Sequence, residues 1–331
     1  MPISKSGKWI FLFVVWSFGA HSQAKLDKND LIWGKDQEFD LNDFPDASIV
    51  RTSDDFFLAK GKLGKSNPPN STASFVFEDK EIKNSGEFNN DTVAILESVE
   101  PKKVQLAKVR WIAGVKFDPT FFPFRYNLGR IYEIEKNYEK ALIEFEHAKN
   151  EVPQYYRTYI HIGELSLILR EPHYAVAQWK EAARLNPMDT TAFLLLAEYY
   201  LETGLNNRCK QYINLALKID EESPNAKLAL ARLAFQSGNE FGAYKIFKRT
   251  RLESPEGKPK QYEKKFHYFY AETSSKLGDY EKAEEQYSIL LKYPNDPFFS
   301  NFPIKVIERR RDIAKKFADV KRLQREDDES L

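Results

Sequence analysis

The chain repeats itself every 34 residues over much of its length. Three prolines and three alanines keep this step: Pro119, Pro153, Pro187, Ala107, Ala141 and Ala175. A period of this length is typical of a solenoid in which one pair of antiparallel helices stacks on the next. Because no single pair can bury its own apolar face, the pairs must pack on one another. The period therefore predicts an all-α array of helical hairpins.

The composition supplies a core for such an array and argues against one class of partner. Hydrophobic residues make up 42% of the chain, which contains 25 Phe, 17 Tyr and 5 Trp. Aromatic rings bury about 150–250 Å² each, which suits helix pairs that meet across narrow interfaces. The formal net charge is +1, so no basic field attracts a polyanion. We therefore expect no nucleic-acid partner.

The residue types at fixed places in each period resemble the tetratricopeptide repeat family. That pattern has Leu followed by Gly or Ala in the first helix, Ala and an aromatic residue in the second, and Pro after it. Residues 122–155 match with Leu128, Gly129, Tyr132, Ala141, Phe145, Ala148 and Pro153. Residues 156–189, 190–223 and 224–257 continue the frame without interruption, and 264–297 resumes it. The resemblance implies a right-handed α-solenoid.

The edges of the array are less regular. Residues 258–263 are predicted to be an insert before the last repeat, and 88–121 to be a degenerate first repeat. In that first repeat, Asp91 is expected to cap a short helix, because its carboxylate can accept from free amide groups. Pro101 is expected to begin the second helix, where its missing N–H costs nothing. The array thus spans residues 88–297.

Residues 298–331 are predicted to form a C-terminal capping helix and an acidic tail. The helix is expected over 303–325, and the tail, residues 326–329, is expected to fray. Four apolar residues share one face that is expected to cover the last repeat: Val306, Ile313, Phe317 and Val320. A basic amphipathic helix on an anionic membrane is the alternative. Acidic residues interrupt the basic ones, which favours the cap.

The N-terminus has the pattern of an export signal. Lys5 and Lys8 precede an unbroken apolar run over residues 9–16, and Ser22-Gln23-Ala24 offers small residues for cleavage before Lys25. The run is shorter than the ~20 residues that a membrane span needs. We therefore predict a signal peptide over 1–24 and an exported, periplasmic protein. The alternative is an uncleaved anchor in the inner membrane, the only case in which membrane contact is expected.

Residues 25–87 differ from the rest of the chain. The stretch 66–72 is rich in Ser, Asn and Pro, which favours turns. Residues 48–50 and 74–77 are short apolar runs that could form strands. The segment is predicted to be irregular, with at most one hairpin, or disordered.

No motif predicts chemistry. Residues 59–66 fit a loose phosphate-loop pattern, but Asn67-Pro68-Pro69 follows where a helix must begin. His161 and Glu164 lie one helical turn apart, yet a metal site needs three or four ligands. The one cysteine, Cys209, is expected to be a small core residue. We predict no catalytic residue, no metal and no cofactor.

The resemblance places a partner on the first helices of successive repeats, which line a concave groove in the family. It implies an apolar row beside a row of mixed charge, suited to an extended peptide or a helix. The residues expected to line it are Tyr126, Arg130, Glu133, Arg157, Ile160, Glu164, Leu194, Glu198, Leu228, Arg232, Phe235, Tyr268 and Glu272. The alternative is that some of these residues pack in the core of a hairpin or are covered by residues 25–87.

The predicted function is a non-enzymatic scaffold that binds a protein partner in this groove. The alternative is a membrane-anchored accessory subunit of an envelope enzyme or secretion complex. Both follow from the resemblance and the N-terminal pattern.

Overall fold

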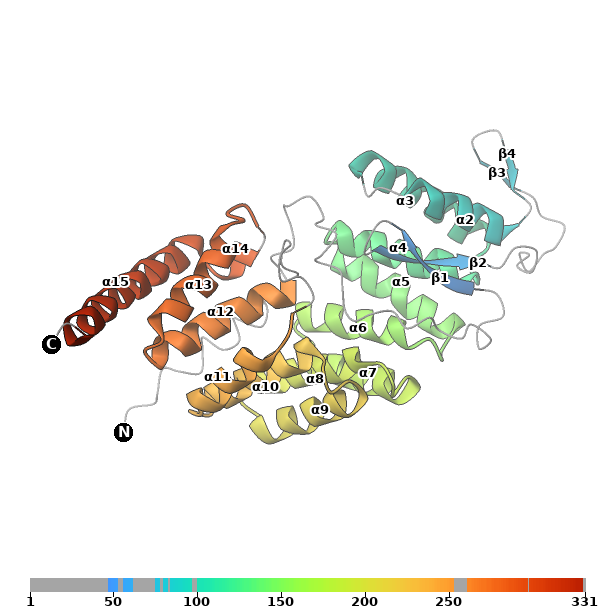
Figure 1. The fold of residues 1–331 in the computed structure, drawn as a ribbon. Helices are drawn as coiled ribbons and strands as arrows, with labels where there is room; N and C mark the ends of the chain where they lie inside the picture. The colour runs from blue at the N-terminus through green and yellow to red at the C-terminus, as the bar shows by residue number, and fades with distance from the viewer. Residues whose placement is uncertain are drawn as a thin grey trace, which may run out of the picture. The chain divides into compact units, whose positions relative to one another are not determined.

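The computed structural model describes residues 47–52, 56–61, 75–77, 80–82, 84–96, 100–252, 261–296 and 298–329. Helices dominate these residues and run antiparallel in successive pairs (Figure 1). The described residues up to Ala192 belong to one compact unit, the N-terminal unit, and those from Phe193 onward to a second, the C-terminal unit. Consecutive helical hairpins, as the period predicts, therefore make up most of each unit.

The N-terminal unit begins with short strands and continues with helices. Its elements are β1 (Ala47–Thr52), β2 (Phe56–Gly61), β3 (Phe75–Phe77), β4 (Lys80–Ile82), α2 (Ser85–Ile95), α3 (Pro101–Phe117), α4 (Phe122–Ile134), α5 (Tyr138–Glu151), α6 (Tyr156–Ile168) and α7 (Pro172–Leu185). The pairs α2–α3, α4–α5 and α6–α7 are in contact, and each pair touches the next.

The unit boundary falls inside the next helix, α8 (Thr190–Glu202). The C-terminal unit continues with α9 (Asn206–Ile219), α10 (Pro224–Gln236), α11 (Glu240–Arg249), α12 (Gln261–Lys276), α13 (Tyr280–Leu291), α14 (Phe298–Asn301) and α15 (Ile304–Glu329). Contacts join α10 to α11, α12 to α13, and α13 to α15. We call α4, α6, α8, α10 and α12 the A helices, and α5, α7, α9, α11 and α13 the B helices.

Strands form in the segment that the sequence predicts to be mostly irregular. β1 pairs with β2 and β3 with β4, both antiparallel. Residues 48–50 lie within β1, and residues 75–77 of the second expected run form β3, while residue 74 lies outside the described residues. Each strand pairs with a neighbour, so there are two hairpins instead of one. β2 also packs against α2 and α4. Ala59, Lys60 and Gly61 of the phosphate-loop pattern lie in β2, and the rest of that pattern, residues 62–66, lies outside the described residues.

The predicted signal peptide, residues 1–24, lies outside the described residues, as do residues 25–46. Among the helices that the structure describes, none combines the length and the apolar character needed to span a membrane.

Prolines and polar caps mark the helix boundaries. The helices α3, α5 and α7 end two residues before Pro119, Pro153 and Pro187, as expected for a residue that cannot donate to the helical ladder. Pro101 is the first residue of α3, as predicted. The cap predicted at Asp91 is wrong. Asp91 lies inside α2, and the Asn84 side chain caps that helix by accepting from the Glu87 amide at 3.0 Å.

Four hairpin turns contain a residue with left-handed backbone geometry, at positions that the spacing of the prolines does not predict. Lys136, Arg170, Gly204 and Gly238 all have φ between 60° and 78° and keep the same 34-residue step. At each one, the chain reverses between an A helix and a B helix. Glycine adopts this conformation without steric cost, which accounts for its use at two of the four turns.

Close crossing of the two helices in a hairpin depends on a small residue in the A helix. A Cβ built on Gly163 of α6 would lie 2.9 Å from Cε2 of Trp179 and overlap the indole ring. Trp179 is fully buried in α7 and donates from Nε1 to the Ile160 carbonyl at 3.4 Å. The ring therefore has no room to move away.

We expect Gly163→Ala to lower the free energy of unfolding by about 1–3 kcal/mol, because overpacking outweighs the gain of about 1 kcal/mol in helix propensity. Gly129→Ala in α4 is the matched control, since the nearest atoms to its Cβ would be those of the Phe145 ring edge at 3.0 Å, a less severe overlap. Urea unfolding of both variants checks this. Equal losses would show that the Trp179 contact does not limit the packing.

The C-terminal residues depart from the sequence prediction in three places. Helix α12 begins at Gln261, inside the predicted insert. The helix α15 runs on to Glu329, so the stretch expected to fray is helical. The face of α15 that packs is also different, and consists of Ile307, Ala314 and Ala318, each 1% exposed or less. Alanines let α15 approach α13 closely, whereas the larger predicted face stays outside.

Candidate functional site

The residues expected to line a groove all lie on the A helices, and we call this surface the A-helix face. Its expected members are more enclosed than an open groove requires, because none of the thirteen is exposed. The five that are buried are Tyr126, Arg130, Ile160, Leu228 and Arg232. Tyr126, Ile160 and Leu228 therefore offer little surface to a partner and act as packing residues.

In the N-terminal unit, a polar network joins α4 to α6. Arg130 donates from Nη1 to Glu133 Oε2 at 2.6 Å, and His161 Nδ1 lies 3.0 Å from Glu133 Oε1. Because a carboxylate accepts, the His161 Nδ1–H is the donor. Nε2 then accepts from the Tyr126 hydroxyl at 3.2 Å. The His161 ring also stacks on Phe145 with centroids 4.8 Å apart.

Burial and charge set the protonation states in this network. Burial lowers the pKa of His161, so the imidazole is neutral near pH 7. Burial works against ionisation of Glu133, but His161 and Arg130 hold the pKa of that carboxyl below its usual value. The network therefore contains one carboxylate, one guanidinium and a neutral imidazole.

Glu164 stands beside this network without a close cation. His161 Nδ1 of the neutral imidazole lies 3.9 Å from Glu164 Oε2, and the Glu164 side chain is 15% exposed. Burial, and then the charge of Glu133, raise the pKa of Glu164 to about 8 against the opposing charge of Arg130. Glu164 is therefore largely protonated at neutral pH. The sequence indicated its spacing from His161 but not this burial.

In the C-terminal unit, Arg232 of α10 joins two carboxylates of α8. It donates to Glu198 at 2.6 Å and also to Glu202. Lys265 of α12 lies 3.4 Å from Glu198, so this network spans three A helices. Burial opposes ionisation of Glu198, but Arg232 and Lys265 lower its pKa to about 2. Sequence reasoning missed Glu202 and Lys265, although Glu198 and Arg232 lie one period apart.

The last A helix is tied to the capping helix. Arg310 of α15 forms an ion pair with Glu272 and donates to the Tyr268 hydroxyl at 2.6 Å. Glu272 also accepts from the hydroxyl of Tyr287. The contribution of Arg310 could not be read from the repeat pattern, because it comes from outside the repeats.

These networks change the expected role of the charged row. Arg232 and Glu272 are engaged with neighbouring helices of their own unit. Arg130 pairs with Glu133 within α4, and its Nη1 lies 3.2 Å from His161 Nδ1 of α6. A partner must compete with those contacts or bind beside them. In the N-terminal unit, β2 also packs against α4, which carries Tyr126, Arg130 and Glu133. Part of the segment 25–87 therefore packs against the first A helix.

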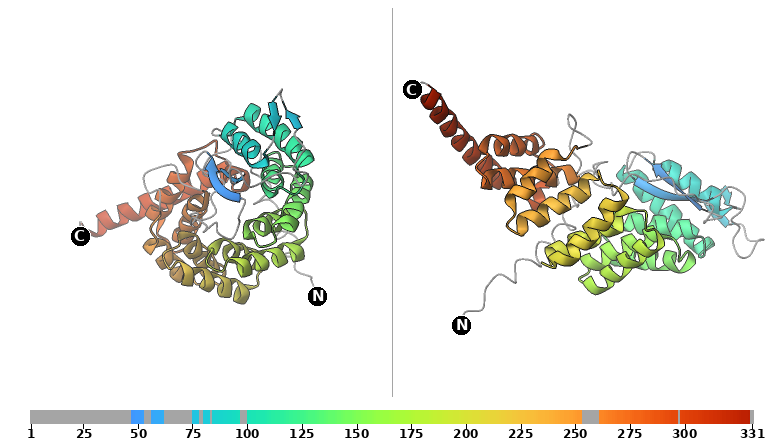
Figure 2. Two further views of the ribbon diagram at one scale, coloured as in Figure 1. Left: turned by 90° about the vertical axis from the view of Figure 1, so that its right-hand side faces the viewer. Right: turned by 60° about the horizontal axis from the view of Figure 1, so that its bottom comes forward.

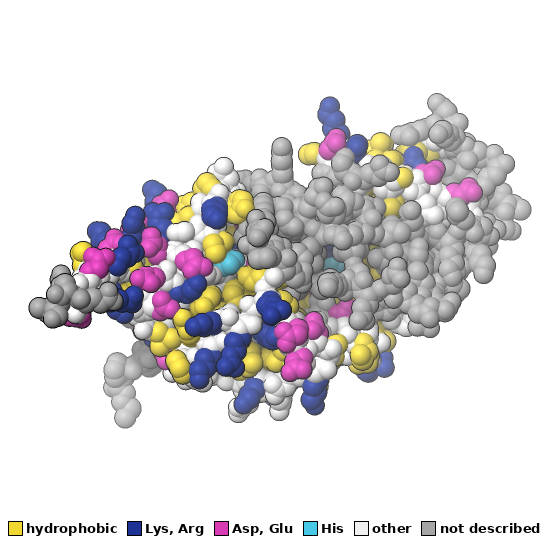
Figure 3. Space-filling model, in the orientation of Figure 1, with side chains coloured by type: hydrophobic (Ala, Val, Ile, Leu, Met, Phe, Trp, Pro, Cys, Tyr) yellow, Lys and Arg dark blue, Asp and Glu magenta, His cyan; other side chains and the backbone are white. Residues whose placement is uncertain are grey.

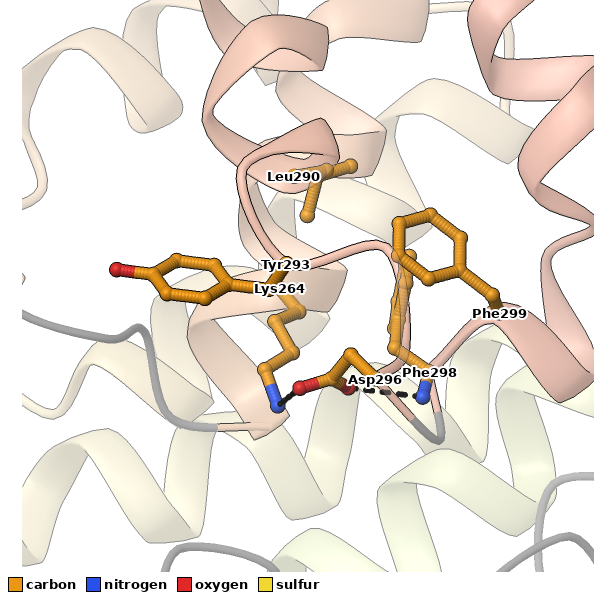
Figure 4. Close-up of a pocket in the computed structure, with 6 residues that line it drawn as sticks. All are labelled: Lys264, Leu290, Tyr293, Asp296, Phe298 and Phe299. Atoms are coloured by element: carbon orange, nitrogen blue, oxygen red, sulfur yellow. Dashed lines mark hydrogen bonds and ion pairs between the residues drawn. The ribbon is translucent and has the colours of Figure 1, made fainter. Parts of the chain in front are cut away.

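A small cavity in the C-terminal unit holds a buried ion pair. Figure 4 shows Lys264, Leu290, Tyr293, Asp296, Phe298 and Phe299 around it. Lys264 donates to Asp296 Oδ2 at 2.7 Å, and the other oxygen accepts from the Phe298 amide at 2.9 Å. The two side chains are 3% and 2% exposed. The pair fastens α12 to the chain before α14 and leaves no open space for a ligand.

The remaining chemical candidates are inert or scattered. Cys209 is fully buried, which raises the pKa of its thiol to about 12, with Glu198 contributing. It is therefore the small core residue that the sequence predicts. Within the described part of the chain, no group of three His, Cys, Asp or Glu side chains is placed to hold a metal ion.

Comparisons with known proteins identify the repeat type. The family model described as tetratricopeptide repeat matches residues 122–150 and 190–223. A solved tetratricopeptide repeat protein from Parabacteroides merdae is 18% identical with a TM-score of 0.53, over 71% of this chain and 93% of that one. The PilF protein of Pseudomonas aeruginosa is 17% identical with a TM-score of 0.50, over 67% of this chain and 99% of that one.

A curated relative matches a shorter stretch of this chain. The CTR9 homolog of Arabidopsis thaliana is 24% identical over 141 residues, which is 41% of this chain and 13% of that protein. The chain thus matches only a small part of that longer protein. The structural likenesses show the fold. The family model thus matches two segments of the chain, and the fold is similar to the consecutive helical hairpins of a solved tetratricopeptide repeat protein.

Proposed function

We propose that the chain is a non-enzymatic scaffold and that a protein partner binds the A-helix face of the C-terminal unit. Tetratricopeptide repeats generally mediate protein–protein interaction, and their proteins are generally not enzymes. One observation supports the location. Leu194, Phe235 and Tyr268 are partly exposed on three successive A helices, α8, α10 and α12.

These three residues supply apolar contacts beside a polar network. The Glu198, Arg232 and Lys265 cluster lies on the same helices. The ammonium nitrogen of Lys276 lies 5.0 Å from the centroid of the Phe235 ring, so a cation contacts one of the three apolar residues. An extended peptide or a helix with spaced apolar side chains fits such a surface, because each anchor meets one repeat.

Crosslinking followed by affinity capture from native cells tests this location. We expect intact protein to capture a specific partner and a Leu194→Ala, Phe235→Ala variant to lose it. The matched control is Leu215→Ala, Phe241→Ala, which removes the same side chains from B helices α9 and α11, where they are exposed. Melting temperatures show whether each variant folds. Capture of the same partner by a folded A-face variant would contradict the proposed location.

We also propose that the protein is exported, on the sequence of residues 1–24. N-terminal sequencing of the native protein is expected to begin at Lys25. A start at Met1 would instead favour an anchored accessory subunit.

A further inference from the structure

Arg310 of α15 contacts one of the three apolar residues of the proposed partner surface. It donates from Nη1 to the Tyr268 hydroxyl at 2.6 Å, and its guanidinium carbon lies 5.8 Å from the centroid of the Tyr268 ring. The same nitrogen forms an ion pair with Glu272. Tyr268 and Glu272 lie one helical turn apart on α12. The ring and the carboxylate together therefore hold one guanidinium group.

The two groups that hold this guanidinium are themselves fixed by other contacts. Glu272 accepts from the hydroxyl of Tyr287, a residue of α13 that is 1% exposed. The Tyr268 ring lies against Phe302, with ring centroids 4.4 Å apart. None of these contacts involves Arg310. The ring and the carboxylate therefore form a site whose geometry does not depend on its present occupant.

Arg310 is the weakly held member of this arrangement. Its side chain is 40% exposed, and ion pairs that water reaches contribute little. Arg310 belongs to the first turns of α15, whose C-terminal end runs out beyond the helices of its unit (Figure 2). A guanidinium group from another molecule therefore makes the same contacts by replacing one weak pair.

A second ring on the same surface has the same kind of neighbour. Lys276, which lies against the Phe235 ring, forms an ion pair with Glu240 at 2.6 Å and is 55% exposed. Figure 3 shows Lys and Arg side chains next to Asp and Glu side chains over much of the C-terminal unit. The face of an aromatic ring attracts cations. Both aromatic residues of the surface are thus contacted by a cation that a carboxylate holds.

We propose that Tyr268 and Glu272 bind an arginine side chain of the partner, and that Arg310 blocks this site until the partner displaces it. Tyr268 is one anchor of the partner surface proposed above, and the inference rests on that surface. Arginine fits better than lysine, because its planar group bonds a carboxylate and a hydroxyl while also contacting a ring. An acidic side chain fits less well, because Glu272 repels it. The affinity for the partner is lowered by the fraction of molecules in which Arg310 fills the site.

Selection of short peptides displayed on phage against the Arg310→Gln protein tests the proposal. We expect the selected peptides to contain arginine. As synthetic peptides they should bind the variant about two- to tenfold more tightly than wild type, because the competing exposed pair is gone. Arg309→Gln is the matched control, since Arg309 is the exposed neighbour of Arg310 in α15. It should leave the wild-type affinity unchanged.

Two further changes test the contacts themselves. Replacing the peptide arginine with citrulline, which has the same shape and no charge, is expected to weaken binding by about tenfold or more. Adding Glu272→Gln to Arg310→Gln should have the same effect. Melting temperatures show that each variant folds. Selected peptides without a basic residue would overturn the proposal, and so would affinities that neither Arg310→Gln nor Glu272→Gln changes.

The Leu194→Ala, Phe235→Ala variant separates this site from the wider surface. Peptides that depend on Glu272 but bind this variant normally would support the arginine site and contradict the extended partner surface. Peptides that need Leu194 and Phe235 but are indifferent to Glu272→Gln would support the surface and overturn the arginine site.

Discussion

Replacing Lys264 with methionine is expected to lower the free energy of unfolding by about 3–5 kcal/mol, because it leaves a buried carboxylate without its cation. Lys264 and Asp296 are almost fully enclosed and 2.7 Å apart. After the substitution, the Phe298 amide still donates to Asp296. That backbone hydrogen bond does not replace the attraction of an ammonium group for a buried carboxylate.

The double variant Lys264→Met, Asp296→Asn provides the internal check. A neutral amide oxygen can still accept from the Phe298 amide, and no charge stays buried, so we expect most of the lost stability to return. Lys282→Met is the exposed control, because Lys282 and Glu285 are 34% and 53% exposed and such pairs contribute about 0–1 kcal/mol. Urea unfolding measures all three. Equal losses for Lys264→Met and Lys282→Met would contradict the proposed role of the buried pair.

Replacing Glu164 with glutamine is expected to change how stability depends on pH. In the unfolded chain this carboxyl ionises around its ordinary pKa of 4.5, whereas in the folded protein its pKa is about 8. Between those values the folded state holds a proton that the unfolded state has released. The contribution of Glu164 to stability therefore falls as pH rises from 4.5 to 8, by about 1.4 kcal/mol for each unit of pKa difference at most.

Glutamine removes this dependence, because it does not ionise. We expect wild type and Glu164→Gln to have similar stability at pH 4.5, and the variant to be more stable by about 2–4 kcal/mol at pH 8. Unfolding free energies measured across this range check the result. Glu151→Gln, an exposed change in α5, should give a curve parallel to wild type. Parallel curves for Glu164→Gln as well would show that Glu164 is ionised in the folded protein at neutral pH.

The repeat period predicts the helices well because its signals are local. Pro119, Pro153 and Pro187 follow the ends of α3, α5 and α7, since proline cannot donate to the helical ladder. Gly163 lies at a close helix crossing, where a Cβ would overlap the Trp179 ring. Each of these residues acts on its own hairpin, so its effect can be read from neighbours in the chain.

The candidate site is only partly predictable for the opposite reason. Residue spacing places Glu164, Glu198 and Arg232 on A helices, which the structure confirms. It does not indicate that Arg232 would bind two carboxylates of α8, or that Lys265 would join them from α12. Those contacts depend on how far apart the helices pack, which is set by side chains elsewhere in the core.

The C-terminal helix shows the same division most clearly. The sequence by itself determined that residues 304–329 would be largely helical and amphipathic, because both properties follow from residue order. Only the tertiary structure decided which face packs. Close approach to α13 favours the small Ala314 and Ala318 over the larger Ile313 and Phe317. Hydrophobicity predicts that a residue prefers burial, but the space between two helices decides which residue is buried.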